Sequence, residues 1–184
     1  ISEQTAKLDL QGPLSEKILR KLININFPSR FHFIETRIEN IKLLLSRTGY
    51  TAENGFELYF PIEEAEKMWN KLLEAGKNEG LKPIGLGARD TLRIEACHPL
   101  YGHELNESIT PIEANFGWAV KTEKPDFIGK PILKRQKEQG TDRILVPFEM
   151  IDNGIPRANY EIFTDNEQIG YVTSGTFSPT FRKP

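Results

Sequence analysis

The stretch Asn54–Lys77, NGFELYFPIEEAEKMWNKLLEAGK, carries the clearest structural signals in the sequence. It opens on Asn-Gly, a pair typical of turns, and residues 56–60 then alternate between apolar and polar like a half-buried strand. Pro61 ends that strand and begins a helix that we expect to run to about Lys77. The helix is predicted because apolar side chains recur along it at spacings of three and four residues. They are Ile62, Ala65, Met68, Trp69, Leu72 and Leu73.

The flanking segments repeat these two patterns. Further strands are expected where polarity alternates or where aromatic and β-branched residues gather. With the strand already described, they are 6–10, 31–38, 41–46 and 56–60. A short helix N-capped by Ser15 is expected after the first strand, and another helix from Ala88 to about Cys97. This order predicts an α+β fold, a mostly antiparallel sheet with helices on one face.

After residue 121 the character of the sequence changes. Residues 122–140 read as a polar linker followed by a short basic helix over 131–140. Short strand-like runs then follow at 144–150, 160–163 and 168–173, separated by turn signals. They predict the start of a small all-β domain over 141–184, with too few strands to close a barrel. The expected division is therefore 1–121, 122–140 and 141–184.

The composition narrows the class of protein. The chain has 184 residues, a formal net charge of −2, 27% charged residues and one cysteine. Such a composition is that of a globular domain, and no apolar run approaches the roughly 20 residues that span a bilayer. A near-zero net charge gives no overall attraction for nucleic acid, so neither a membrane nor a nucleic-acid partner is expected. Because the sequence begins at Ile1 rather than Met, we expect a fragment or a processed chain.

One local cluster of side chains contains residue types that can bind a metal ion. Cys97, His98, His103 and Glu104 lie close together in the sequence. Adjacent residues diverge by about 100° on a helix, and Pro99 prevents a simple continuation of that helix. We therefore expect an ordinary helix end and surface loop here, and no metal site.

The segment Ser46–Glu57, SRTGYTAENGFE, could form one wall of a pocket for a planar ligand. The ring of Tyr50 offers a stacking face. Glu57 can accept two parallel hydrogen bonds from adjacent N–H groups, such as the edge of a 2-amino-pyrimidinone. Strand alternation places Glu57 on the same face as Tyr59. The alternative is a solvent-facing glutamate on a half-buried strand.

The segment Gly87–Glu95, GARDTLRIE, places two arginines one turn apart on one helix face. Arg89 lies near the helix N-terminus, where the backbone dipole favours an anion. It could clamp a carboxylate or a polarised heterocycle. The alternative is a structural ion pair, for instance between Asp90 and Arg93.

These segments closely resemble the conserved blocks of the aminomethyltransferase family, the T-protein of the glycine cleavage system. Ser46–Glu57 resembles its signature, and Gly85–Glu95 (GLGARDTLRIE) resembles the next block. Further matching blocks follow in order and cover nearly the whole chain. They are Leu8–Pro13, Leu100–Leu105, Thr110–Ala114, Phe127–Lys130 and Val172–Thr180.

The resemblance implies a fold and a reaction. The fold would be the ferredoxin-like half of the aminomethyltransferase fold, followed by an incomplete small β-barrel domain. The reaction would be transfer of the aminomethyl group from the lipoyl arm of H-protein to tetrahydrofolate, with release of ammonia and 5,10-methylenetetrahydrofolate and without a metal. Carried over by position, Tyr50, Glu57 and Arg89 stand at folate-contacting positions, and Tyr101 is a weaker candidate. The location would be the cytoplasm of a bacterium, or the mitochondrial matrix of a eukaryote.

Two departures from the family qualify this expectation. Ala52 and Asn54 stand where the family usually has glycine and aspartate, and Ala52 would be strained if its φ were positive. The chain is also about half the family's length. The resemblance places the catalytic aspartate and a further arginine contact outside it, so no residue here is assigned a catalytic role. The chain alone is expected to be inactive and to lack partner strands for residues 6–10 and 41–60.

Two other functions compete with this one. The chain could be a folate-binding module with another role, as in the related iron–sulfur assembly factors or the folate domains of dimethylglycine and sarcosine oxidases. The Cys-containing signature of the assembly factors is absent here. A protein-interaction domain that uses the basic helix around Lys134–Lys137 is the third reading, and it explains none of the ordered blocks.

Overall fold

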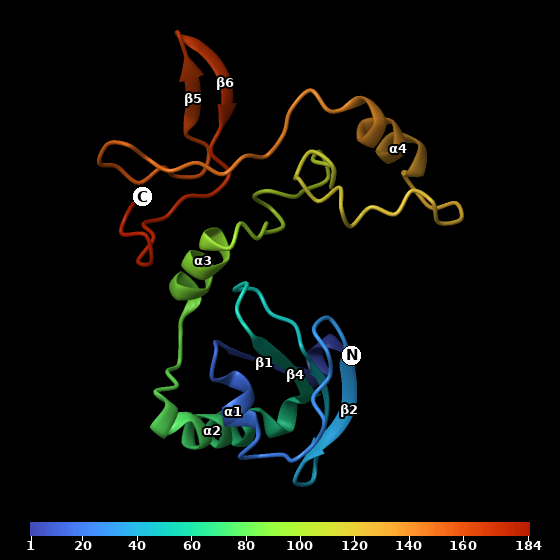
Figure 1. Cartoon of the computed structure of the whole chain (residues 1–184), viewed down its shortest axis with the longest axis vertical. Coiled ribbons are helices and arrows are strands. Elements are labelled where there is room, and N and C mark those ends of the chain that lie inside the picture. The colour runs from blue at the N-terminus through green and yellow to red at the C-terminus, as the bar shows by residue number, and fades with distance from the viewer. The chain divides into compact units, whose positions relative to one another are not determined.

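The structure is a computed structural model that describes residues 1–184. The chain divides into two compact units, Ile1–Leu92 and Arg93–Pro184 (Figure 1). The helix α3 (Leu86–Glu95) contains the division. The domain boundaries expected at residues 121 and 141 stay a prediction.

The first unit is built on a four-stranded antiparallel sheet. Its strands are β1 (Thr5–Gln11), β2 (Phe33–Ile38), β3 (Ile41–Ser46) and β4 (Gly55–Pro61). The spatial order is β1-β4-β3-β2, so the first and last strands of this sheet along the chain are neighbours. All four strands expected from the sequence are present, and β2 and β3 pair as an antiparallel hairpin.

The helices of this unit are α1 (Ser15–Leu19) and α2 (Ala65–Gly76), with single 3-10 turns at Ser2–Gln4, Ile62–Glu64 and Lys77–Glu79. The helix expected from Pro61 to Lys77 is thus an α-helix between two 3-10 turns. Ser15 was expected as the N-cap of α1, and that detail is wrong: Leu14 is the cap and Ser15 is the first helical residue. The buried Ser15 hydroxyl instead donates to the carbonyl oxygen of Asn54 at 3.3 Å.

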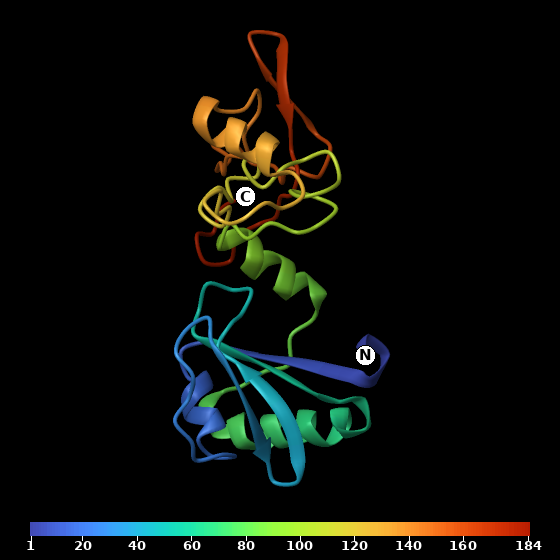
Figure 2. The ribbon, with the colours of Figure 1, turned by 90° about the vertical axis from the view of Figure 1, so that its right-hand side faces the viewer.

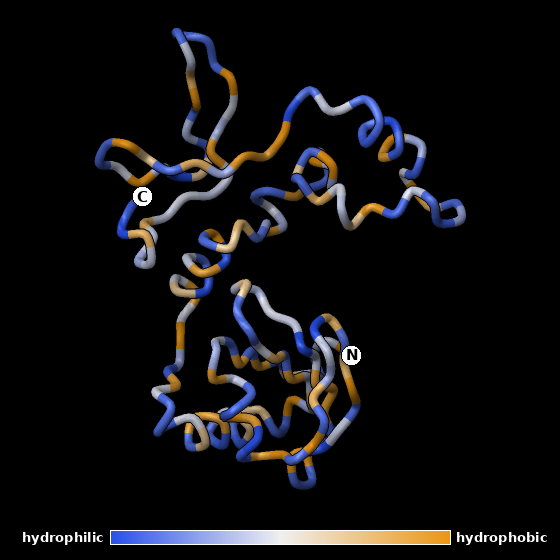
Figure 3. The backbone as a smooth tube through the Cα atoms, in the orientation of Figure 1, coloured by the Kyte–Doolittle hydropathy of each residue, from blue (hydrophilic) through white to orange (hydrophobic).

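The core lies between one face of this sheet and the helices α1 and α2, which cover the same side (Figure 2). Alternation along β4 buries Phe56, Leu58 and Phe60 and leaves Glu57 and Tyr59 on the other face. Figure 3 shows this alternation as blue and orange along the strands. Ile18 and Leu19 of α1 and Met68 and Leu72 of α2 complete the buried set from the helical side.

The second unit has less regular structure. Besides the end of α3 it contains α4 (Lys130–Gln139) and a hairpin of β5 (Glu161–Thr164) and β6 (Glu167–Tyr171). The basic helix and two of the three expected strands are therefore confirmed. The strand expected at 144–150 is wrong, because no neighbouring strand pairs with that segment. Its backbone donates only isolated hydrogen bonds, from Leu145 to Glu113 and from Met150 to Pro184.

The α+β prediction is confirmed, with a four-stranded antiparallel sheet, helices on one face and a small β portion near the C-terminus. No helix combines the length and the apolar character that a membrane crossing requires.

The packing of β4 predicts where the first unit is most sensitive. Leu58 is fully buried, so Leu58→Ala should lower the free energy of unfolding by about 2–5 kcal/mol through lost burial and a cavity. Leu86 is 83% exposed, and the matched Leu86→Ala should change it by less than about 0.5 kcal/mol. The two tryptophans are Trp69 in α2 and Trp118 in the second unit. Urea unfolding followed by Trp69 fluorescence in a Trp118→Phe background reports on the first unit, and equal losses in both variants would contradict the assignment.

Candidate functional site

The loop between β3 and β4 is wrapped around one side chain of β1. Gln11 donates from Nε2 to the carbonyl oxygen of Thr48 at 3.2 Å and accepts from the Thr51 hydroxyl at 3.1 Å. A Cβ atom on Gly49 or Gly55 would lie 2.0 Å or 2.2 Å from the Gln11 Oε1 atom. Both glycines of the loop therefore allow the Gln11 amide to sit inside it and to fix its course.

The tip of this loop contains the backbone strain that the sequence suggested. Ala52 has a φ of 59°, in the left-handed region where a Cβ is unfavourable. Asn54 keeps a turn role through its carbonyl oxygen, which accepts from the Gly12 N–H at 2.7 Å. Alanine in place of the family's usual glycine at residue 52 therefore lowers the stability of the loop locally. Asparagine in place of aspartate at residue 54 leaves the backbone contacts of the turn intact.

Glu57 projects from β4 onto the face of the sheet opposite the core and is held by three neighbours. Its Oε1 lies 2.5 Å from the Lys7 ammonium nitrogen. Its Oε2 accepts from the Thr48 hydroxyl and, at 3.3 Å, from the Tyr59 hydroxyl. The prediction that Glu57 and Tyr59 share a face is confirmed. The glutamate side chain is only 14% exposed, so it is not a freely solvated surface carboxylate.

The surroundings of Glu57 favour its charged form. Burial alone would raise the pKa of Glu57, but hydrogen bonds from Lys7, Thr48 and Tyr59 outweigh it and lower the pKa below 4.5. Burial opposes the charge of Lys7 as well, yet the hydrogen bond to Glu57 and the nearby Asp9 raise the Lys7 pKa. The pair is therefore ionised at neutral pH.

Tyr50 and Arg89 are brought together although they come from separate sequence blocks. The guanidinium carbon of Arg89 lies 4.4 Å from the centroid of the Tyr50 ring, a cation–π contact. Tyr50 follows Thr48, which bonds Glu57, in the same loop. The first unit thus contains an aromatic face, a guanidinium stacked on it and an ionised carboxylate bonded to the loop that carries the aromatic ring.

Arg93 has a different role from Arg89. Its guanidinium is 2% exposed, lies 2.8 Å from the Glu104 carboxylate and donates to the Ser174 hydroxyl at 2.8 Å. This structural ion pair belongs to the second unit. Glu104 could not be predicted as its partner, because Arg93 lies on a helix and Glu104 in a loop beyond Pro99.

The other predicted residues also belong to the second unit. Tyr101 is 70% exposed, and its role as a ligand contact stays a prediction. Glu104 accepts from Arg93 and from the Leu100 N–H, and the His103 Nδ1 atom lies 3.2 Å from the Thr173 carbonyl oxygen. His103 therefore connects this loop to Thr173, whereas Glu104 is bound to Arg93 and to the backbone of Leu100.

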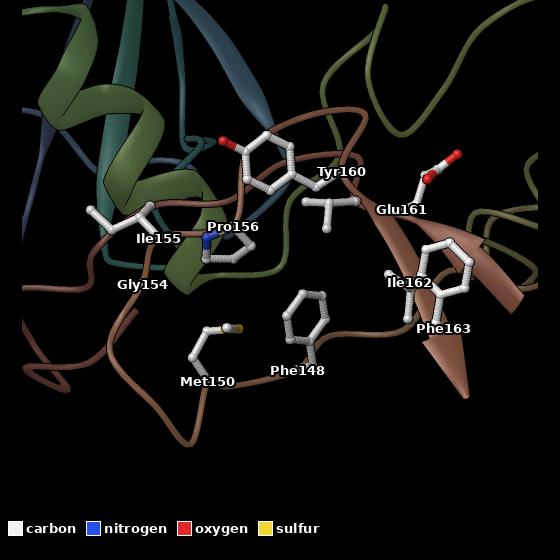
Figure 4. Close-up of a pocket in the computed structure, with 10 residues that line it drawn as sticks. Phe148, Met150, Gly154, Ile155, Pro156, Tyr160, Glu161, Ile162 and Phe163 are labelled. Carbon is white, nitrogen blue, oxygen red and sulfur yellow. The ribbon is translucent and has the colours of Figure 1, made fainter. Parts of the chain in front are cut away.

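The second unit also contains an apolar hollow of about 420 Å³ (Figure 4). Its walls include the side chains of Phe148, Met150, Ile155 and Tyr160. Glu161 is the single ionisable carboxylate on its rim. A ligand site usually combines an apolar cavity with several convergent polar groups, so this hollow is a weaker candidate than the face around Glu57.

Two known protein domains match this chain. Residues 1–124 match the GCVT N-terminal domain, and residues 143–184 match the glycine cleavage T-protein C-terminal barrel domain. The chain belongs to the glycine cleavage T-protein family of aminomethyltransferases. The resemblance of the sequence blocks to this family is confirmed.

Similar individual proteins are known in bacteria. The chain is 56% identical over 189 residues to an aminomethyltransferase of Halalkalibacterium halodurans and 52% identical over 185 residues to one of Desulforamulus reducens, with 100% of the chain and 51% of each relative covered. The crystal structure of glycine cleavage system aminomethyltransferase T from Bartonella henselae matches with a TM-score of 0.88 and 32% identity, over 98% of this chain and 50% of that one. The chain spans about half the length of the curated relatives it matches.

The strain at the loop tip yields a stability prediction. Ala52→Gly should raise the free energy of unfolding of the first unit by about 0.5–1 kcal/mol, because glycine adopts positive φ without a steric penalty. The control Ala88→Gly lies inside α3 and should lower it by up to about 1 kcal/mol. Urea unfolding of both variants measures the effect. A loss of stability in Ala52→Gly would show that the left-handed conformation is not adopted.

The Glu57 network yields a pH prediction. Its pKa is depressed in the folded state, so its stabilising contribution is present above the unfolded value near 4.5 and is lost as the pH falls through the folded pKa. The stability advantage of the wild type over Glu57→Gln should therefore be largest near neutral pH and should shrink below about pH 4.5. Unfolding curves of the two proteins across this range give the difference. A difference that does not vary with pH would refute the charge-based account.

Proposed function

We propose that this chain supplies part of the tetrahydrofolate-binding wall of an aminomethyltransferase of the glycine cleavage system. In this reaction the aminomethyl group carried on the lipoyl arm of H-protein passes its one-carbon unit to tetrahydrofolate, and ammonia and 5,10-methylenetetrahydrofolate are released. Family membership and the names of the relatives support the reaction class. Tetrahydrofolate is the one-carbon acceptor in this proposal, lipoylated H-protein is the partner, and no metal takes part.

The observation that carries the folate proposal is the arrangement around Glu57. A carboxylate offers about four lone-pair positions, and Lys7, Thr48 and Tyr59 occupy three of them. One position therefore remains for a ligand N–H group. A second parallel bond forms if the Tyr59 hydroxyl, the longest of the three contacts at 3.3 Å, turns away. The amino-pyrimidinone edge of a pterin presents two such adjacent N–H groups.

Tyr50 and Arg89 would act on the flat part of the same ligand. The Tyr50 ring provides a stacking surface, and the Arg89 guanidinium, exposed on the outside of α3, can exchange its contact with the ring for a polarised oxygen of the ligand. These groups bind and orient, and orientation of two reactants lowers the barrier to transfer between them. We assign no catalytic group to this chain, and Tyr101 remains a candidate contact. The proposed location is the bacterial cytoplasm, in keeping with the bacterial relatives.

Two substitutions in a full-length aminomethyltransferase that includes this chain test the binding role. Glu57→Ala and Arg89→Ala should each weaken tetrahydrofolate binding by roughly 5- to 150-fold. In Glu57→Ala the buried N–H groups of the ligand lose their charged acceptor, and in Arg89→Ala a polarised oxygen of the ligand loses its charged donor. Glu63→Ala removes an exposed glutamate from the turn after β4 and serves as the matched control. Isothermal titration measures the affinities. Unchanged affinity in Glu57→Ala would remove the folate assignment.

The isolated chain provides a second test. Purified 1–184 should not form methylenetetrahydrofolate from loaded H-protein, because the resemblance places the catalytic aspartate outside these residues. A coupled assay of methylenetetrahydrofolate with the full-length protein as positive control measures this. Transfer by the isolated chain at the full-length rate would show that a catalytic group lies within it.

A further inference from the structure

The exposed face of the β1–β4 pair has an unusual charge arrangement. Asp9 and Glu57 stand directly opposite each other in the antiparallel register, and Lys7 stands opposite Tyr59. The Lys7 ammonium nitrogen lies 2.5 Å from the Glu57 Oε1 atom and 3.2 Å from the Asp9 Oδ1 atom. It also lies 5.6 Å from the centroid of the Tyr59 ring. One lysine thus bridges two carboxylates that the sheet places side by side.

This register would be unfavourable without the lysine. Like charges directly opposite on neighbouring strands repel, and two close carboxylates raise the pKa of one of them. Asp9 is twice as exposed as Glu57, with 29% against 14% of the side chain accessible, so water solvates Asp9 better. Glu57 would therefore be the carboxylate that takes up a proton if the cation between them were lost.

The remaining groups that face Glu57 carry no charge at neutral pH. Ser46 is its register partner on β3, Thr48 approaches from the loop, and Tyr59 lies on its own strand. Burial and the neighbouring Glu57 both raise the pKa of the Tyr59 phenol, which keeps it neutral. Lys7 and Asp9 on β1 are therefore the charged neighbours of Glu57.

We propose that Lys7 is a positioning residue for ligand binding, which holds the Glu57 carboxylate ionised and fixed in direction against the opposing charge of Asp9. The proposal rests on the proposed function, since it concerns how Glu57 meets its ligand. An ionised carboxylate only accepts hydrogen bonds, whereas a protonated one also donates. Lys7 therefore makes the site specific for a ring edge with N–H donors and keeps that specificity as the pH falls.

The first measurement concerns the charge of Glu57 and needs no ligand. The titration midpoint of the Glu57 carboxyl carbon is followed by NMR in chain 1–184. Lys7→Met should raise this midpoint by about one pH unit, because only the hydrogen bonds from Thr48 and Tyr59 then oppose burial and the charge of Asp9. Lys7→Arg should restore it, and adding Asp9→Asn to Lys7→Met should lower it again. Lys17→Met removes an exposed lysine of α1 that pairs with Glu79, remote from Glu57 in the sequence, and should leave the midpoint unchanged.

The rescue by Asp9→Asn separates electrostatics from packing. If Lys7 acted only through the packing of its methylene groups, removing the charge of Asp9 would not reverse the effect of Lys7→Met on the Glu57 midpoint. An unchanged Glu57 midpoint in Lys7→Met, or a double variant that behaves like Lys7→Met, would overturn the proposal. The amide spectrum of each variant shows whether the sheet is intact, and Lys7→Arg keeps the comparison available if Lys7→Met unfolds.

The second measurement follows tetrahydrofolate affinity from about pH 7.5 to about pH 4.5 in a full-length aminomethyltransferase that includes this chain. Lys7→Met should lose affinity as the pH falls, by about fivefold relative to the wild type at the acidic end, and Lys7→Arg should follow the wild type. If the wild type binds and Lys7→Met follows it throughout, only the positioning role is refuted. If the wild type does not bind tetrahydrofolate, the proposed function fails and the positioning role fails with it.

Discussion

The register of β4 against β1 is the constraint on which the first unit depends. Side chains on a strand alternate between faces, so one pairing buries Phe56, Leu58 and Phe60 against the helices and places Glu57 on the opposite face. A slip by one residue would turn the three apolar side chains to water and bury the glutamate. The core therefore fixes the position of the candidate ligand group. The same pairing sets Asp9 opposite Glu57, with the Lys7 ammonium group in contact with both carboxylates.

The loop that follows β3 is determined by a different kind of contact. One of its anchors is the amide of Gln11, which Gly49 and Gly55 approach more closely than a residue with a Cβ could in the same backbone position. Thr48 belongs to this loop and also bonds Glu57, while Tyr50 stands two residues further on. The sheet and the loop are thus joined through Gln11 and Glu57. Because both anchors are side chains of adjacent strands, the aromatic face of the loop is positioned by the sheet.

Much of the first unit could be predicted from sequence because its signals are local. Alternation identified the four strands, and helical spacing identified α2. The shared face of Glu57 and Tyr59 was likewise predictable, whereas strain at Ala52 was expected only from the glycine that the family usually has there. Contacts between residues distant in the sequence could not be predicted. The alternation of β1 does not indicate that Lys7 bonds Glu57, because this contact depends on the strand order β1-β4-β3-β2. The strand expected at 144–150 failed for the same reason, because a strand also requires a neighbour to pair with.

The helix α3 shows why spacing alone could not assign its two arginines. Arg89 and Arg93 lie one turn apart, and the sequence allows either to be a ligand group or half of an ion pair. Burial separates them. Arg93 is enclosed with Glu104, and removing one partner of such a pair leaves an uncompensated charge at a cost of about 3–5 kcal/mol. Arg89 is exposed, and a cation over an aromatic ring at an exposed site gains only about 0.5–1 kcal/mol. A contact that weak can be exchanged for a ligand, whereas the buried pair cannot, so of the two arginines we propose only Arg89 as a ligand contact.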